Sequence, residues 1–105
     1  MTMFSGTEGQ QIPLTEAITM CSNYRSANPS SIKGLFYGSD ILNDILSQEN
    51  VVGIRMYYAL DEDGAKQLVL VGVDTDGNDL YDGIVADRGQ PCPNFCDSGS
   101  SPLNK

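Results

Sequence analysis

The chain has 105 residues, of which 40% are hydrophobic, and a formal net charge of −8 at pH 7. This length suits one domain with one core, and the hydrophobic content is too high for a disordered acidic chain. The six Lys and Arg residues are scattered and form no basic cluster. The composition therefore argues against binding to nucleic acid or to an anionic membrane surface.

No apolar run is long enough to cross a bilayer. Residues 1–20 also lack the basic start and continuous hydrophobic centre of a secretory signal. The default expectation is a cytoplasmic location. A signal that was cleaved before this sequence begins would leave the same pattern, so secretion stays open.

The first third of the chain predicts an arm, a helix and a short strand. Residues 1–11 are rich in Gly, Ser and Thr without periodicity, which predicts a flexible arm with Phe4 as its one anchor. Apolar residues at three- and four-residue spacing then predict an amphipathic helix over residues 15–27, with Thr15 as its N-cap. The short aromatic run over residues 32–37 predicts a strand.

A second helix is predicted from Asp40 to Ser47 or Gln48, with Ser39 as its N-cap. Its apolar stripe consists of Ile41, Leu42, Ile45 and Leu46. Helices that precede a series of strands are typical of α+β domains. We therefore expect one α+β domain over residues 12–96 and a C-terminal tail over residues 97–105, with both helices packed on one face of the sheet.

Three apolar runs at residues 51–60, 66–73 and 80–87 are separated by two turns that contain Asp-Gly. Gly tolerates the positive φ of tight turns, so these runs predict an antiparallel meander within a three- to four-stranded sheet. The second run is apolar at nearly every position, which predicts the central strand. In the first run, alternation places on one face, expected to be buried, Ile54, Met56, Tyr58 and Leu60.

The negative charge gathers in the meander. Residues 61–87 contain eight acidic residues against one lysine, a net of −7. Because successive turns of a meander lie at opposite ends of the sheet, we expect acidic residues at both ends. One end holds Asp61, Glu62, Asp63 and Asp87, and the other holds Asp74, Asp76 and Asp79.

The face opposite the helices is expected to expose an apolar patch of Tyr57, Val69, Val71, Tyr81 and Val85. Such a patch on a monomer usually marks a contact surface, which predicts a protein partner or self-association. The alternative is that the N-terminal arm or the C-terminal tail covers it. The favoured function is therefore a small acidic interaction or accessory module.

A cation site is the second possibility. The acidic turn Asp74, Asp76, Asn78 and Asp79 resembles a calcium loop, because closely spaced oxygen ligands suit a hard cation. The EF-hand pattern is incomplete, since Asp79 occupies the position of its invariant Gly and Val85 that of its last Glu. Asp, Gly and Asn are also the ordinary residues of a hairpin turn, which is the simpler reading.

Cys92 and Cys96 could form a disulfide, a thiol redox pair or part of a metal site. Their spacing is one residue longer than in the Cys-x-x-Cys redox motif. A zinc site would also need Cys21 and a carboxylate such as Asp97, although Cys21 suits core packing. The chain has no histidine to serve as a base, which weighs against catalysis.

The segments Leu68–Asp74, Gly77–Leu80 and Cys92–Cys96 together resemble a pattern in small bacterial proteins of unknown function. In these proteins a GVDxxGNDL turn is followed by a CPxxC close near the C-terminus. The resemblance covers about the C-terminal half of the chain. It implies a bacterial source, but no activity, cofactor or catalytic residue.

Overall fold

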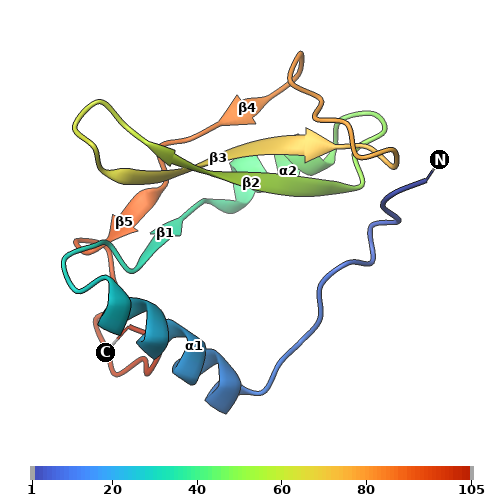
Figure 1. Ribbon diagram of the computed structural model, residues 1–105. Coiled ribbons are helices and arrows are strands. Elements are labelled where there is room, and N and C mark those ends of the chain that lie inside the picture. Colours follow the sequence, from blue (N-terminus) through green and yellow to red (C-terminus); the bar gives the residue numbers. More distant parts are fainter. Residues whose placement is uncertain (1, 105) are drawn as a thin grey trace. The chain divides into compact units, whose positions relative to one another are not determined.

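The computed structural model describes residues 2–104. Its contacts divide the chain into two compact units. Unit 1 contains residues 2–9 and 37–89, and unit 2 contains residues 10–36 and 90–104. Each unit has one helix and an antiparallel sheet (Figure 1), which confirms the predicted α+β class.

Unit 1 is built on a three-stranded antiparallel sheet in the order β2-β3-β4. The strands are β2 (Gly53–Leu60), β3 (Lys66–Val73) and β4 (Val85–Ala86). The predicted meander and its central strand are therefore confirmed. The third strand is shorter than the predicted 80–87, because a turn in which the Gly83 amide donates to the Leu80 carbonyl at 3.1 Å uses its first half.

Residues that pair across antiparallel strands point to the same side, so the register assigns each residue to one of two faces. We name the two faces after Tyr58 and Tyr57. The Tyr58 face contains Ile54, Met56, Tyr58, Leu60, Leu68, Leu70 and Gly72. The Tyr57 face contains Arg55, Tyr57, Val69, Val71, Val73 and Val85. The core lies along β3, where Leu70, Val71 and Val73 are all buried.

The helix of unit 1, α2 (Ser39–Leu46), packs on one end of the Tyr58 face. Its Ile45 is fully buried, and a Cβ added at Gly72 would lie 3.4 Å from the Ile45 Cγ2 atom. Gly72 pairs with Ile54, so α2 lies at that end of β2. A Cβ at Gly72 would also come within 2.7 Å of the Val51 Cγ2 atom, so the glycine makes room for the segment that joins α2 to β2.

The rest of the Tyr58 face is open, which corrects the prediction that Met56, Tyr58 and Leu60 are buried. Their exposed fractions are 52%, 95% and 69%. An eight-residue helix is about 12 Å long, whereas an eight-residue strand spans about 26 Å. Because α2 is shorter than the strand that it was expected to cover, half of the face reaches solvent.

Unit 2 contains α1 (Leu14–Ala27) and a two-stranded sheet of β1 (Gly34–Phe36) and β5 (Gln90–Cys92). The predicted strand over residues 32–37 therefore pairs with the segment after the meander and not with the meander itself. We predicted that both helices pack on one face of the sheet. The α2 helix does so, while for α1 this stays a prediction.

The end of the chain is held by two basic residues of unit 2. The Arg25 Nη1 atom donates to the Leu103 carbonyl at 2.7 Å, and the Lys33 Nζ atom donates to the Asn104 carbonyl at 2.7 Å. The segment predicted as a tail thus has specific hydrogen bonds through residue 104.

Both helices begin one residue before the predicted start. Pro13 and Gly38 precede them in extended conformations, and neither helix has a side-chain cap bond, so the predicted caps Thr15 and Ser39 are wrong. Pro13 has no backbone N–H, so it adds no unpaired donor at this end of the helix. No helix among residues 2–104 is long and apolar enough to span a bilayer.

Candidate functional site

A polar network lies on the Tyr57 face, where β2 approaches the loop that follows β3. The Arg55 Nη1 atom donates to the Asp79 Oδ1 atom at 2.5 Å and to the Gly77 carbonyl at 3.2 Å. The Tyr57 hydroxyl donates to the other carboxylate oxygen of Asp79. The pKa of Arg55 is raised, chiefly by its hydrogen bond to Asp79 and next by its interaction with the Tyr57 side chain. The network fixes the loop to β2.

The N-terminal arm is seated on the same loop. The amides of Met3 and Phe4 both donate to the Thr75 carbonyl, at 2.7 and 2.9 Å. The Arg55 guanidinium carbon lies 5.7 Å from the centre of the Phe4 ring, within cation–π range. Gly77 has φ +87°, and a Cβ there would come within 2.5 Å of the Met3 Sδ atom. Glycine suits this positive φ and leaves room for the Met3 side chain.

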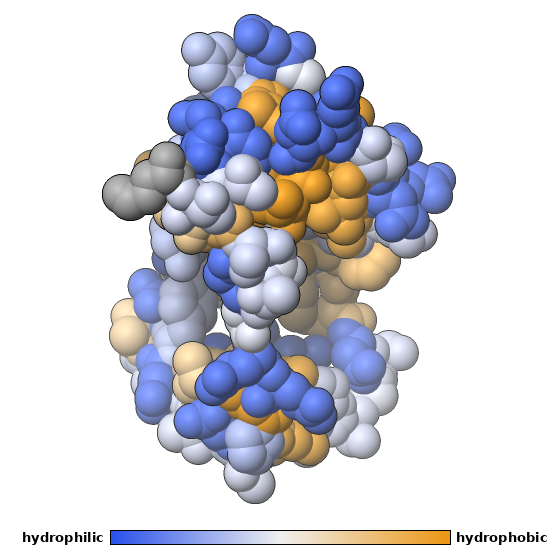
Figure 2. Space-filling view, turned by 90° about the vertical axis from the view of Figure 1, so that its right-hand side faces the viewer, coloured by the Kyte–Doolittle hydropathy of each residue, from blue (hydrophilic) through white to orange (hydrophobic). Residues whose placement is uncertain are grey.

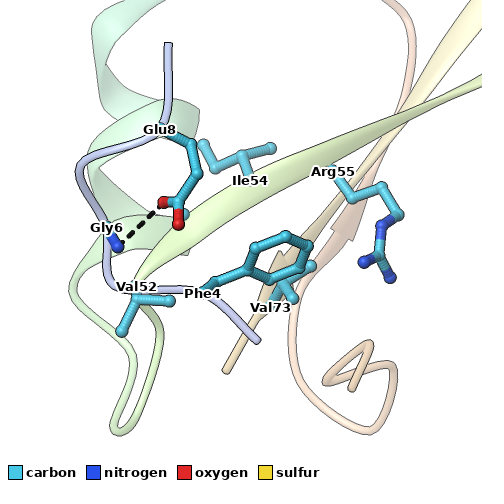
Figure 3. Close-up of a pocket in the computed structure, with 8 residues that line it drawn as sticks. Phe4, Gly6, Glu8, Val52, Ile54, Arg55 and Val73 are labelled. Carbon is cyan, nitrogen blue, oxygen red and sulfur yellow. Dashed lines mark hydrogen bonds between the residues drawn. The ribbon is translucent and has the colours of Figure 1, made fainter. Parts of the chain in front are cut away.

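A pocket of about 320 Å³ lies between the arm and the start of β2 (Figure 3). Its lining residues include Phe4, Gly6, Glu8, Val52, Ile54, Arg55 and Val73. The Glu8 carboxylate accepts hydrogen bonds at 2.9 Å from the amides of Ser5 and Gly6. These bonds, with that from Ser5 the largest cause, lower the pKa of Glu8. Figure 3 shows Glu8 beside Ile54, so a carboxylate stands at the first residues of β2.

The predicted cation loop is closed by its own hydrogen bonds. The Asp74 Oδ1 atom accepts from the amides of Asp76 and Asn78 at 3.0 and 2.9 Å, and its Oδ2 atom accepts from the Asn78 side chain at 3.2 Å. These bonds, led by that from the Asn78 amide, lower the pKa of Asp74. Asp79 is bonded to Arg55 and Tyr57. Within residues 2–104 no three metal-ligating side chains are grouped, and the calcium site stays a prediction.

The two acidic turns lie at opposite ends of β3, as the meander predicts. Residues 61–64 precede β3, and residues 74–78 follow it. Eight residues of strand separate them by about 26 Å. The side chains of Asp61, Glu62 and Asp63 are exposed.

Four of the five residues of the predicted interaction surface share the Tyr57 face: Tyr57, Val69, Val71 and Val85. Tyr57 and Val85 are about half exposed, but Val71 is 3% exposed and does not face solvent. Tyr81 lies in the loop before β4 and lines a hollow together with Arg55 and Asp79. The α2 helix lies on the other face, as expected. The role of the Tyr57 face in binding stays a prediction.

The sequence predicted that the Tyr58 face is buried, so this face was not among the predicted contact surfaces. Met56, Tyr58 and Leu60 are exposed at successive positions of one side of β2. Figure 2 shows from one side that apolar area of unit 1 reaches the surface between hydrophilic groups. The signal was present in the sequence, because the apolar stripe of the second helix is too short to cover an eight-residue strand.

Cys92 and Cys96 form a disulfide in unit 2, with their Cα atoms 4.6 Å apart. Cys21 on α1 is a free thiol and is partly exposed. The disulfide uses two of the three thiols that the predicted zinc site would need. Of the three alternatives for this pair, the structure contains the disulfide, while a redox role stays a prediction.

No family model, no curated protein and no solved structure matches this chain. The resemblance of its C-terminal half to small bacterial proteins therefore stays a prediction.

Proposed function

We propose that this protein is an acidic protein-interaction module that binds its partner through the exposed part of β2. The supporting observation is the row of Met56, Tyr58 and Leu60, which are 52%, 95% and 69% exposed on one side of the strand. Apolar side chains that are grouped in this way usually mark contact surfaces. Tyr and Met are also enriched in protein interfaces.

The charge pattern favours a basic partner. The chain has a net charge of −8, and β2 itself contains no acidic residue. Exposed carboxylates stand near both of its ends, at Glu8 and at residues 61–63. Complementary charge around an apolar contact speeds encounter and disfavours partners of the same sign. The apolar row supplies the contact, and the flanking carboxylates select its partner.

Light scattering with size-exclusion chromatography tests the proposal. The protein is measured alone and mixed with lysozyme as a basic probe, at low and high salt. We expect a complex at low salt that both Met56→Gln and Tyr58→Ser weaken. The matched controls are Met20→Gln, at a similarly exposed methionine of α1, and Tyr81→Ser, at an exposed tyrosine outside β2.

The possible outcomes separate the surfaces. A protein that stays monomeric and ignores the basic probe at low salt would contradict the proposal. A complex that Tyr81→Ser weakens and Tyr58→Ser does not would assign binding to the Tyr57 face. A complex that every variant retains would reflect net charge alone and would also contradict it.

A second candidate is thiol redox chemistry, which the Cys92–Cys96 disulfide supports. Redox-active cysteines have a lowered thiol pKa and are therefore alkylated quickly at neutral pH. The test is the alkylation rate of the reduced protein, with Cys21→Ser present so that only the pair reacts. A rate no faster than that of a free peptide thiol would exclude this role.

A further inference from the structure

We infer that the outer edge of β2 accepts an extended segment of the partner as an added strand, and that this segment has basic residues at both ends. The inference rests on the proposed function and names the kind of partner that the same surface fits. It depends on three features of unit 1, which are the open backbone of β2, the side chains beside it and the charges at its two ends.

The backbone of β2 is paired on one side alone. All eight residues from Gly53 to Leu60 pair with β3, and no other strand among residues 2–104 pairs with β2. Alternate residues of such an edge point their N–H and C=O groups outward, ready to bond another strand. Proteins usually protect a long edge with Pro, Lys or a bulge. This one has no Pro or Lys, and its one charge, Arg55, is bonded to Asp79.

The side chains along the edge suit a strand with an apolar centre. On one side an added strand would lie next to Met56, Tyr58 and Leu60, and on the other next to the half-exposed Tyr57. Pairs of aromatic and β-branched side chains across neighbouring strands stabilise sheets. The edge therefore favours a segment in which Val, Ile or Thr fills the middle positions.

The charges at the ends of β2 set the ends of the segment. Glu8 lies beside Ile54 at the start of the strand, and Asp61, Glu62 and Asp63 follow its last residue. These groups are separated by the length of β2, about 26 Å. Lys or Arg residues about eight positions apart in an extended segment would reach both groups.

The same charges disfavour a second copy of this chain. An antiparallel partner β2 would bring its own residues 61–63 next to Glu8, so that carboxylates would face carboxylates at both ends. Both copies also have a net charge of −8. Like charges across an interface are unfavourable, so the occupant that fits is a basic-ended segment of another protein.

Binding of a synthetic peptide tests the inference directly. The probe is Lys-Lys-Thr-Val-Thr-Val-Thr-Val-Lys-Lys with a fluorophore at one end, measured by fluorescence anisotropy at low salt. One control peptide has N-methyl groups on its six central amides, and another has Glu in place of every Lys. We expect the N-methylated peptide to bind about tenfold more weakly, because it cannot donate to the edge, and the Glu peptide not to bind.

Two double variants test the position of the site. Glu62→Lys with Asp63→Lys reverses the charge at one end of β2, and we expect it to weaken binding about fivefold or more. The matched control, Asp40→Lys with Asp44→Lys, makes the same charge change on exposed positions of α2 and should leave affinity within about twofold. Amide hydrogen exchange should show new protection at alternate residues of β2 when the first peptide binds.

Each contrary outcome has a distinct meaning. Equal binding of the N-methylated peptide would overturn strand addition, but would leave the interaction module intact. Equal binding of the Glu peptide would overturn the charge assignment. Self-association of the protein that the peptide reverses would assign the edge to a second copy. If Tyr58→Ser changes neither peptide binding nor any other association, the proposed function itself fails.

Discussion

The two edges of the three-stranded sheet differ in how much backbone they leave open (Figure 1). On one side β2 presents eight residues, with no further strand beside it in the part of the chain that the structure describes. On the other side β4 has two residues and is followed within two positions by Arg88, whose φ of +66° ends the extended path. One edge is available for pairing, and the other is closed.

The difference arises in the segments that lead into each edge. Before β4, the turn at residues 80–83 uses the chain that could have extended the strand. The Gln48 Oε1 atom accepts from the Ile84 amide at 2.8 Å, so the backbone next to β4 is bonded within the protein. Within residues 2–104, the outer edge of β2 has no comparable turn or glutamine contact. The central strand thus supplies the buried core, while the local turn chemistry decides which edge stays open.

The largest expected effect comes from removing the support that both edges share. Ile45→Ala empties a fully buried position against β3 and should lower the free energy of unfolding by about 2–5 kcal/mol. Urea denaturation measures it, and Leu46→Ala, at a half-exposed neighbour, is the control. Hydrogen exchange should accelerate at both β2 and β4. Acceleration at only one edge would mean that β2 and β4 do not share one core.

A smaller loss of stability is expected when the link between β2 and the loop that leads to β4 is weakened. Asp79→Asn weakens the hydrogen bonds that Asp79 accepts from Arg55 and Tyr57. The side chains of Arg55 and Asp79 are 31% and 24% exposed. At this exposure an ion pair stabilises a fold only weakly, and less at high salt, so the loss of stability should be small and should shrink as the salt concentration rises. Urea denaturation at two salt concentrations measures the change. Asp82→Asn, in the same loop, should have no measurable effect, and an equal loss in both variants would contradict the role of the network.

Acid should act on the turn between the two edges through Asp74. Because hydrogen bonds lower its folded pKa below the ordinary value of 3.8, the charged form stabilises the turn above that pH, and the contribution is lost as pH falls through the folded pKa. Asp74→Asn should remove this part of the acid dependence below about pH 4. Melting temperatures over an acid series measure it. Asp76→Asn should keep the wild-type profile, since the three bonds are made to Asp74.

The smallest change in stability is expected at the open edge itself. Tyr58→Lys replaces a side chain that is 95% exposed, so the free energy of unfolding should stay within about 0.5 kcal/mol of the wild type. Lysine on an edge strand disfavours pairing with another strand, so binding of the basic peptide should be lost. A clear loss of stability in urea would show that Tyr58 is covered in solution, and the contrast between the edges would then be wrong.

The parts of the fold that follow from local pattern were predictable, and the parts that depend on distant pairing were not. Apolar residues at nearly every position of β3 identified the central strand, because such a strand is buried on both sides. Alternation in β2 correctly grouped Met56 with Tyr58, but it could not say whether their side is covered. That answer depends on the length and place of α2.

The remaining features had no local signal. The pairing of β1 with Gln90–Cys92 joins segments more than fifty residues apart, and β5 is a short stretch that contains Pro91. The bond from Arg55 to Asp79 spans 24 positions and brings together a strand residue and a loop residue. Neither spacing nor composition marks such partners, since only the three-dimensional path of the chain makes them neighbours.

The seat of the N-terminal arm ties residues 3 and 4 to the loop after β3 and to Arg55. Residues 3 and 4 are held through one carbonyl, that of Thr75, and the Phe4 ring covers the guanidinium of Arg55. A cut between Phe4 and Ser5 would release that ring and leave Arg55 open to solvent above Asp79. Loss of the Phe4 ring would thus leave a cation more exposed on a surface that is otherwise bordered by carboxylates.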